Sequence, residues 1–183
     1  YKMQKAYTTG LQQQWKDFST IVKLLAEGVE ERDEHFSGHS RRVAELSVRV
    51  AKKLGLPRPR QEVLELAAFL HDIGSIGQKK EFLSKTEELV KEELTEVHTA
   101  AAEQQESLFS SVSSLREVFR IILHHHEWFD GTGYPHGLKG QDIPMESRIL
   151  CVAEAYDAMI SPRPHRSPLS HNDARSVLQK EAG

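Results

Sequence analysis

The chain has 183 residues, of which 38% are hydrophobic and 28% are charged, and its formal net charge is −3. That length suffices for one domain with a buried core, and the composition excludes an intrinsically disordered chain. The small negative charge argues against a protein that wraps DNA or RNA. No apolar run approaches the roughly 20 residues of a membrane span, and the polar first ten residues do not predict a signal peptide. Cys151 is the only cysteine, so we expect no internal disulfide and a cytoplasmic location.

Apolar residues recur at helical spacing along most of the chain, and no segment shows the alternation typical of strands. A first helix is predicted over residues 11–30. Its apolar stripe is compatible with core packing and equally with a coiled-coil seam or a connector to an upstream domain. The domain division is therefore predicted as a connector or dimerisation helix over residues 1–30, followed by one domain over residues 31–183. The stripe consists of Leu11, Trp15, Phe18, Val22 and Leu25.

Six further helices are predicted from apolar periodicity together with capping and turn residues. They are a second helix that carries His35 and His39 and ends near Gly55, a third over residues 61–72 that stops at Gly74, a fourth from about Ser84 through His98, a fifth from Ser114 to His126, a sixth after Pro144, and a last helix after Ser170. A turn rich in glycine over residues 130–137 separates the fifth and sixth helices. The sequence predicts an all-α fold, a single bundle of about seven helices.

Histidines fall on the apolar faces or at the ends of four different predicted helices. One inward histidine commonly belongs to a satisfied core, but burying five unpaired imidazoles would cost several kcal/mol in lost hydrogen bonds. A shared metal cluster satisfies all of them together. His71 and Asp72 also stand at a helix end, where both side chains can reach one point and the carboxylate can bridge two ions. The five histidines are His39, His71, His98, His125 and His126.

Several motifs in this chain together form a recognisable pattern. They are Gly38-His39-Ser40-Arg41-Arg42-Val43, Leu70-His71-Asp72-Ile73-Gly74, His125-His126-Glu127 followed by Asp130-Gly131-Thr132-Gly133-Tyr134-Pro135, Arg148-Ile149-Leu150, Ala155-Tyr156-Asp157-Ala158 and Arg163-Pro164. Through them, residues 30–180 resemble the HD-GYP family, a branch of the HD-domain phosphohydrolases. The resemblance implies a bacterial phosphodiesterase domain that hydrolyses cyclic di-GMP to the linear dinucleotide or to GMP in second-messenger signalling.

The same resemblance implies a metal centre and assigns catalysis to His71 and Asp72. Imidazole-rich sites favour Fe or Mn, with Zn and Ni as alternatives, over Mg or Ca, and we expect two or three divalent ions. Two such ions about 3.5–4 Å apart can share Asp72 and a hydroxide that attacks phosphorus. His124 is expected behind or outside the ligand set. By motif position the implied ligands are His39, His71, Asp72, His98, His125, His126 and Glu154, with His35 as an additional ligand if three ions bind.

For the substrate, the resemblance places Gly133, Tyr134 and Pro135 beside the metals, where Tyr134 would stack on or orient a guanine. Arg163 and Arg166 match the family's phosphate contacts, and a planar guanidinium suits bidentate phosphate binding. The residues alone leave two plainer alternatives open, a simple turn for the loop and a solvated segment for the two arginines.

Two positions depart from the family pattern. Ser75 stands where the family has a lysine, and its hydroxyl lacks the charge that would hold a phosphate. Glu154 stands where the family has aspartate, and its extra methylene displaces the carboxylate. The departures keep open a weakly active or inactive domain that binds metal, nucleotide or a protein partner as a signalling module. A phosphohydrolase for another phosphoester is a third hypothesis. We also expect an upstream sensor or receiver domain and a homodimer through residues 1–30.

Overall fold

The structure, a computed structural model, describes residues 2–30, 37–72, 115–162 and 167–181. Within these ranges the chain forms six α-helices and one short 3-10 helix, and no strand. The prediction of an all-α fold is confirmed. The helices are α1 (Lys2–Glu30), α2 (His39–Lys53), α3 (Arg58–Leu70), α6 (Arg116–Leu123), η2 (Gly140–Asp142), α7 (Met145–Ile160) and α8 (His171–Lys180).

Local signals locate several helix starts. Pro144 is the N-cap of α7, and the Ser170 side chain caps α8 by accepting from the backbone N–H of Asp173, as the sequence predicts. α3 begins at Arg58, three residues before the predicted start. Pro59 is favourable in its first turn, because the backbone N–H that proline lacks would have no partner in the helix there. α1 begins nine residues before the predicted start. The predicted fourth helix, His35, Gly74 and Ser114 lie outside the described residues.

The prediction that the fifth helix runs to His126 is wrong, because α6 ends at Leu123. In a continued helix the Ile122 carbonyl would accept the N–H of His126. Here that carbonyl accepts the backbone N–H of His125 at 3.4 Å and also bonds the Nδ1 atom of the same residue. Residues 124–126 therefore form a turn, and His124 joins a different group of side chains from His125 and His126.

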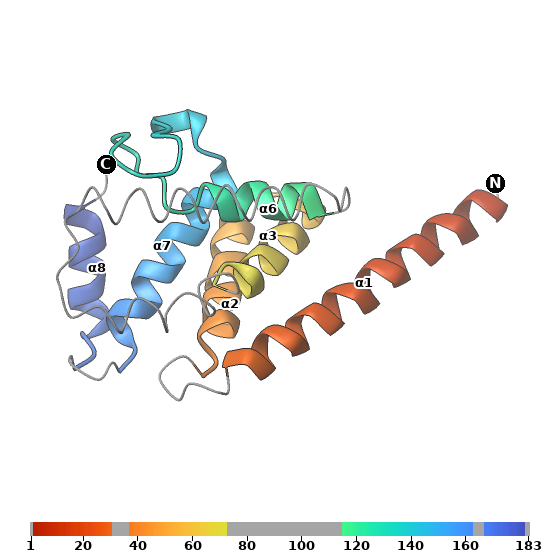
Figure 1. Ribbon diagram of the computed structural model, residues 1–183, viewed down its shortest axis with the longest axis horizontal. Helices are drawn as coiled ribbons and strands as arrows, with labels where there is room; N and C mark the ends of the chain where they lie inside the picture. The colour runs from red at the N-terminus through yellow and green to blue at the C-terminus, as the bar shows by residue number, and fades with distance from the viewer. Residues whose placement is uncertain (1, 31–36, 73–114, 163–166, 182–183) are drawn as a thin grey trace.

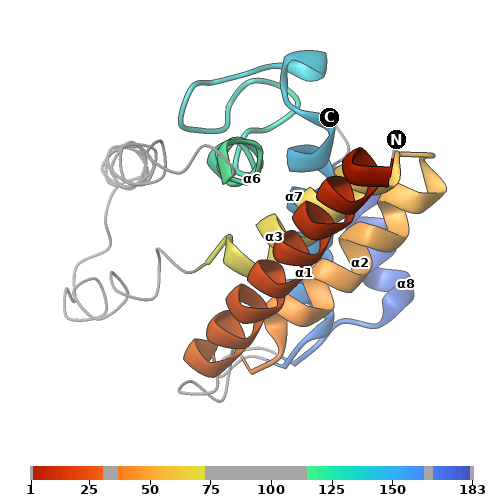
Figure 2. The same cartoon turned by 90° about the vertical axis from the view of Figure 1, so that its right-hand side faces the viewer.

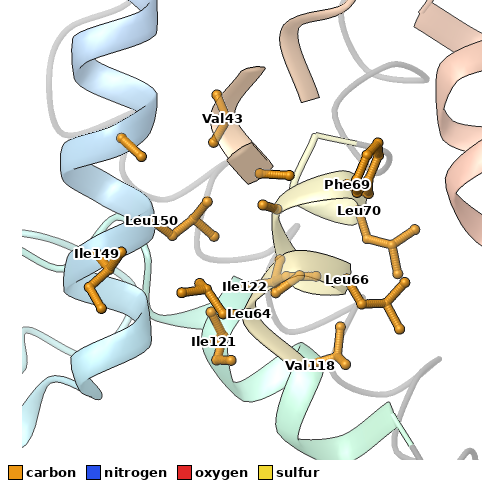
Figure 3. Close-up of a cluster of buried hydrophobic side chains, with 14 of the residues drawn as sticks. Val43, Leu64, Leu66, Phe69, Leu70, Val118, Ile121, Ile122, Ile149 and Leu150 are labelled. Atoms are coloured by element: carbon orange, nitrogen blue, oxygen red, sulfur yellow. The ribbon is translucent and has the colours of Figure 1, made fainter. Parts of the chain in front are cut away.

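The helices pack around α2 and α3 (Figure 1). α2 contacts both α3 and α7, α3 also contacts α6 and α1, and α8 covers α7. The core lies between α2, α3, α6 and α7, where apolar side chains at helical spacing meet (Figure 3). Burying each large aliphatic side chain contributes about 1.5–3 kcal/mol. Fully buried members include Val43, Leu64, Leu66, Val118 and Leu150.

α1 lies against this bundle by one face only. Trp15, Val22 and Ala26 pack onto the core, whereas Leu11 and Leu25 of the predicted stripe are 50% and 62% exposed. The N-terminal end of the helix runs away from the other helices (Figure 1), and from that side α1 is seen in front of the bundle (Figure 2). The stripe is thus divided between a packed face and an exposed face, and a connector or dimer role for it stays a prediction. No helix in the described ranges is both long and apolar enough to cross a membrane.

Candidate metal centre

Three predicted ligands meet where α2 begins and α3 ends. His39 is the first residue of α2, and His71 and Asp72 directly follow α3. The Oδ2 atom of Asp72 lies 3.7 Å from Nε2 of His39 and 3.6 Å from Nε2 of His71. Both imidazoles are buried, whereas the Asp72 side chain is 26% exposed. We call His39, His71 and Asp72 the first half-site.

Three more predicted ligands meet where α6 ends and α7 passes. The Nε2 atom of His125 lies 3.6 Å from Oε2 of Glu154, and the rings of His125 and His126 are 3.8 Å apart between centroids. One ligand atom from each of His125, His126 and Glu154 lies within 4.8 Å of the others. We call these three residues the second half-site.

The two half-sites form one continuous centre. The ring centroid of His71 lies 5.3 Å from that of His39 and 5.6 Å from that of His125, so His71 touches both groups. Helix α7 also serves both, because Glu154 belongs to the second half-site and Asp157, one turn later, bonds His39 of the first. His39, His71 and His125 lie at the ends of α2, α3 and α6, and these helices pack with α7 around one core.

All three central imidazoles are held in the same way, by a hydrogen bond from Nδ1. Nδ1 of His71 donates to the Ala68 carbonyl at 2.8 Å, and Nδ1 of His125 donates to the Ile122 carbonyl. Nδ1 of His39 donates to Asp157 Oδ2 at 2.8 Å. A carbonyl or an ionised carboxylate can only accept, so Nδ1 of each ring carries a proton, and in the neutral form of the ring the lone pair lies on Nε2. Each Nε2 therefore faces a carboxylate as a potential ligand.

The donor set suits a divalent transition metal. Nε2 of His71 is buried and has no hydrogen-bond partner among the described residues, which is costly unless an ion binds it. The three distances from Nε2 to carboxylate oxygen are 3.6–3.7 Å, too long for hydrogen bonds. Two ligands that each lie about 2.1 Å from one ion are roughly 3–3.5 Å apart, so small shifts convert this geometry into coordination.

Electrostatics differ between the imidazoles. Burial by itself lowers the pKa of His39, but the hydrogen bond with Asp157 and the charge of Asp72 outweigh it, so the pKa of His39 is raised. Burial dominates at His125 and lowers its pKa. A neutral imidazole is the form that binds a metal, so the buried environment keeps His125 ready to bind.

Asp157 is the residue that sequence reasoning missed. Its side chain is 1% exposed and accepts from Nδ1 of His39 and from the guanidinium of Arg42, whose Nε lies 2.7 Å from Oδ1. Burial alone would raise the pKa of this carboxyl, but the hydrogen bonds from His39 and Arg42 lower it to about 2. The sequence did offer one signal for it: Asp157 follows Glu154 by three residues, so both side chains lie on the same face of one helix.

The glycine-rich loop lies against the second half-site. The Tyr134 ring is 4.9 Å from the His126 ring between centroids, and its backbone N–H donates to the His126 carbonyl at 3.2 Å. A Cβ on Gly133 would overlap backbone atoms of Trp128, His126 and Glu127, so only glycine fits this close approach. Burial, followed by the charge of Glu154, raises the pKa of Tyr134 and keeps its hydroxyl protonated.

The structure thus brings together six of the eight predicted ligands and places Gly133 and Tyr134 beside them, with Pro135 next in the chain. His35, His98, Ser75, Arg163 and Arg166 lie outside the described residues. The roles of all these residues as ligands or substrate contacts stay predictions.

Comparison with known proteins identifies the relationship. A model of the family described as "HD domain" matches residues 23–183. The chain belongs to the HD domain family. The resemblance to its HD-GYP branch is confirmed by curated relatives that are more than 30% identical.

A protein of Xanthomonas campestris named "Cyclic di-GMP phosphodiesterase response regulator RpfG" is 35% identical, with 88% of this chain and 43% of the relative covered. A Vibrio cholerae protein named "3'3'-cGAMP-specific phosphodiesterase 1" is 32% identical, with 91% of this chain and 38% of the relative covered. This chain therefore spans less than half the length of each of these two curated relatives. A solved structure of a cyclic GMP-AMP specific phosphodiesterase from V. cholerae shares the fold at a TM-score of 0.66 and 17% identity, with 90% of this chain and 44% of that chain covered.

Proposed function

We propose that this domain is a metal-dependent cyclic dinucleotide phosphodiesterase that hydrolyses cyclic di-GMP to the linear dinucleotide or GMP. The observation that carries the proposal is the convergence of three inward Nε2 atoms and two carboxylates into one continuous centre. The names of the relatives support a cyclic dinucleotide as substrate, and they include both cyclic di-GMP and 3'3'-cGAMP. The choice between these two is part of the proposal.

The two half-sites would hold two divalent ions, Fe or Mn by the donor set, and His98 and His35 are proposed to complete a site for two or three. When bound, such ions supply Lewis acidity and neutralise charge on a phosphodiester. Asp72 is proposed as a ligand for both half-sites: its Oδ2 faces His39 and His71 of the first, and its charge acts on His125 of the second. The Nδ1 bonds of His39, His71 and His125 keep these rings aimed inward without reorganisation.

Substrate binding is assigned to the loop and to the two arginines. The Tyr134 ring lies beside His126, so a guanine that stacks on this tyrosine would bring its phosphodiester next to the second half-site. Its protonated hydroxyl can donate a hydrogen bond to a base or phosphate. Arg163 and Arg166 are proposed to bind the phosphates.

The test is hydrolysis of cyclic di-GMP, and of 3'3'-cGAMP in parallel, by protein loaded anaerobically with Fe or Mn. The control is the His71→Ala variant, because His71 contacts both half-sites. Product that forms with the parent chain and vanishes with the variant supports the proposal. Turnover that survives in a His71→Ala or Asp72→Ala variant with metal bound would show that the assigned site is wrong.

Ser75 favours a second candidate, a domain that binds metal or nucleotide without efficient turnover. If the parent chain holds its metals and forms no product, this candidate replaces the first. Ser75→Lys separates the two causes: a raised rate shows that a missing phosphate charge limits turnover, and an unchanged rate shows that the serine is compensated. Glu154→Asp tests the other departure, and unchanged metal content and rate would make that departure innocuous.

A further inference from the structure

A third group of potential ligands lies outside the two half-sites. Nδ1 of His124 is 3.8 Å from Oε1 of Glu127, and the ring of His124 is 5.3 Å from the ring of His136 between centroids. One ligand atom from each of the three lies within 4.8 Å of the others. His124 precedes the second half-site directly, but its Nδ1 faces Glu127, whereas the Nε2 of His125 faces Glu154.

Two observations indicate that this group accommodates a cation. Nδ1 of His124 is buried and has no hydrogen-bond partner among the described residues. Glu127 is 3% exposed, and its two oxygens accept the backbone N–H groups of His136 at 2.7 Å and of Leu138 at 3.0 Å. A buried carboxylate charge beside an unpartnered imidazole nitrogen is costly. A bound ion would balance that charge and would also give the nitrogen a partner.

The three side chains in this group indicate which ion would bind. Two imidazoles and one carboxylate form a common zinc donor set, with water in the fourth position. Ligands about 2.1 Å from one zinc ion are roughly 3–3.5 Å apart, so the three side chains must close by about 1 Å. His136 is exposed in a loop and has room to make that movement, whereas His124 and Glu127 already face each other.

We propose that His124, Glu127 and His136 form a separate site for a zinc-class divalent ion, which fastens the loop over residues 127–138 to the end of α6. The ion would join the two ends of the loop, because His124 and Glu127 precede Gly133 and His136 follows it. Tyr134, which lies against His126, is carried by the same loop. Occupancy would therefore limit how far Tyr134 can move from the second half-site. The proposal does not depend on the reaction that the domain performs.

The test is zinc stoichiometry and affinity by equilibrium dialysis of the full chain, first stripped with a chelator, with Co²⁺ absorption as a second readout. We compare the parent with His136→Gln and with His171→Gln, which replaces a surface histidine on α8 in contact with Tyr156. We expect His136→Gln to bind one ion fewer per chain and to lose one component of the Co²⁺ spectrum, while His171→Gln matches the parent. Melting curves establish that each variant is folded.

The same comparison in a His71→Ala background separates this site from the catalytic centre. In that background the half-sites no longer fill and turnover is absent. We still expect the double variant with His136→Gln to bind one ion fewer per chain than His71→Ala alone. Equal stoichiometry in the parent and in His136→Gln would overturn the proposal. A loss of the same size in His171→Gln would also overturn it. Zinc-dependent slowing of hydrogen exchange at the Leu138 amide, absent in His136→Gln, would establish the loop closure.

Discussion

The first and second half-sites hold their histidines by different means. His39 is oriented by a charged side chain, Asp157, which lies on another helix and is itself paired with Arg42. His125 is oriented by the Ile122 carbonyl, three residues earlier in its own backbone. His71, between them, also uses a local carbonyl, that of Ala68. Within the first half-site, His39 thus depends on a long-range charged partner, whereas His71, and His125 of the second half-site, depend on local backbone geometry.

This difference shows where each half-site is vulnerable. A side-chain substitution or a change of pH can remove the support of His39, because Asp157 can be replaced or protonated. No substitution removes the Ile122 carbonyl, so the second half-site is disturbed mainly by moving its backbone. Gly133 is the position at which one added carbon does so.

Asp157→Asn should have the largest effect. It leaves the buried His39 and the partly buried Arg42 without their shared carboxylate, and breaking such a pair costs about 3 kcal/mol. Metal affinity should fall about 10- to 100-fold, because His39 loses its orienting group. Chelator competition and urea unfolding measure the two effects. Ser161→Ala, which removes only the 3.3 Å bond to Asp157, is the control and should cost less than about 1 kcal/mol. Unchanged affinity in Asp157→Asn would mean that His39 needs no such support.

Gly133→Ala should disturb the second half-site selectively. The new methyl group overlaps backbone atoms of three consecutive residues, 126–128, and such overpacking costs about 1–3 kcal/mol. Faster hydrogen exchange at the Tyr134 amide, which donates to the His126 carbonyl, would report the displacement. Gly10→Ala serves as the control: it lies inside α1, meets no atom within 4 Å, and should stabilise slightly. If Tyr134 exchanges at the parent's rate, the loop has relaxed without cost.

Acid should weaken the first half-site through Asp157. The pKa of this carboxyl is about 2 in the folded protein, below its ordinary value of 3.8. A lowered pKa means that its stabilisation is complete above about pH 4 and is lost as the pH falls towards 2, a change of about 2 kcal/mol. Urea unfolding of the metal-free chain between pH 2 and 5 measures the slope. The Asp157→Asn variant should lack this part of it, whereas two parallel curves would contradict the assignment.

Ser40→Ala should have the smallest effect. The Ser40 hydroxyl and its backbone N–H both donate to Oε1 of the buried Glu30, which joins the end of α1 to the start of α2 beside His39. Removing the hydroxyl leaves the backbone bond, so we expect a loss of about 1 kcal/mol in urea unfolding. Ser37→Ala, at an exposed position, should change stability by less than about 0.5 kcal/mol. Equal values for the two variants would show that this contact does not hold α1 in place.

Local patterns were enough to predict much of this domain. Apolar spacing predicted the helices, and the His71-Asp72 pair was correctly placed at a helix end, because periodicity and dipeptide position are properties of the nearby chain. The Ser170 cap and the start after Pro144 were likewise visible in a few consecutive residues. The motif order indicated the family that the comparisons show.

Tertiary structure alone decided the remaining features. Asp157 and His39 are 118 residues apart in sequence, and only the packing of α7 against α2 makes the carboxylate the partner of that imidazole. The face of α1 that packs is likewise chosen by α3, since helical periodicity defines a stripe but not its partner. The sequence thus specifies which side chains are available as ligands, whereas the packing of α7 against α2 decides which carboxylate orients His39.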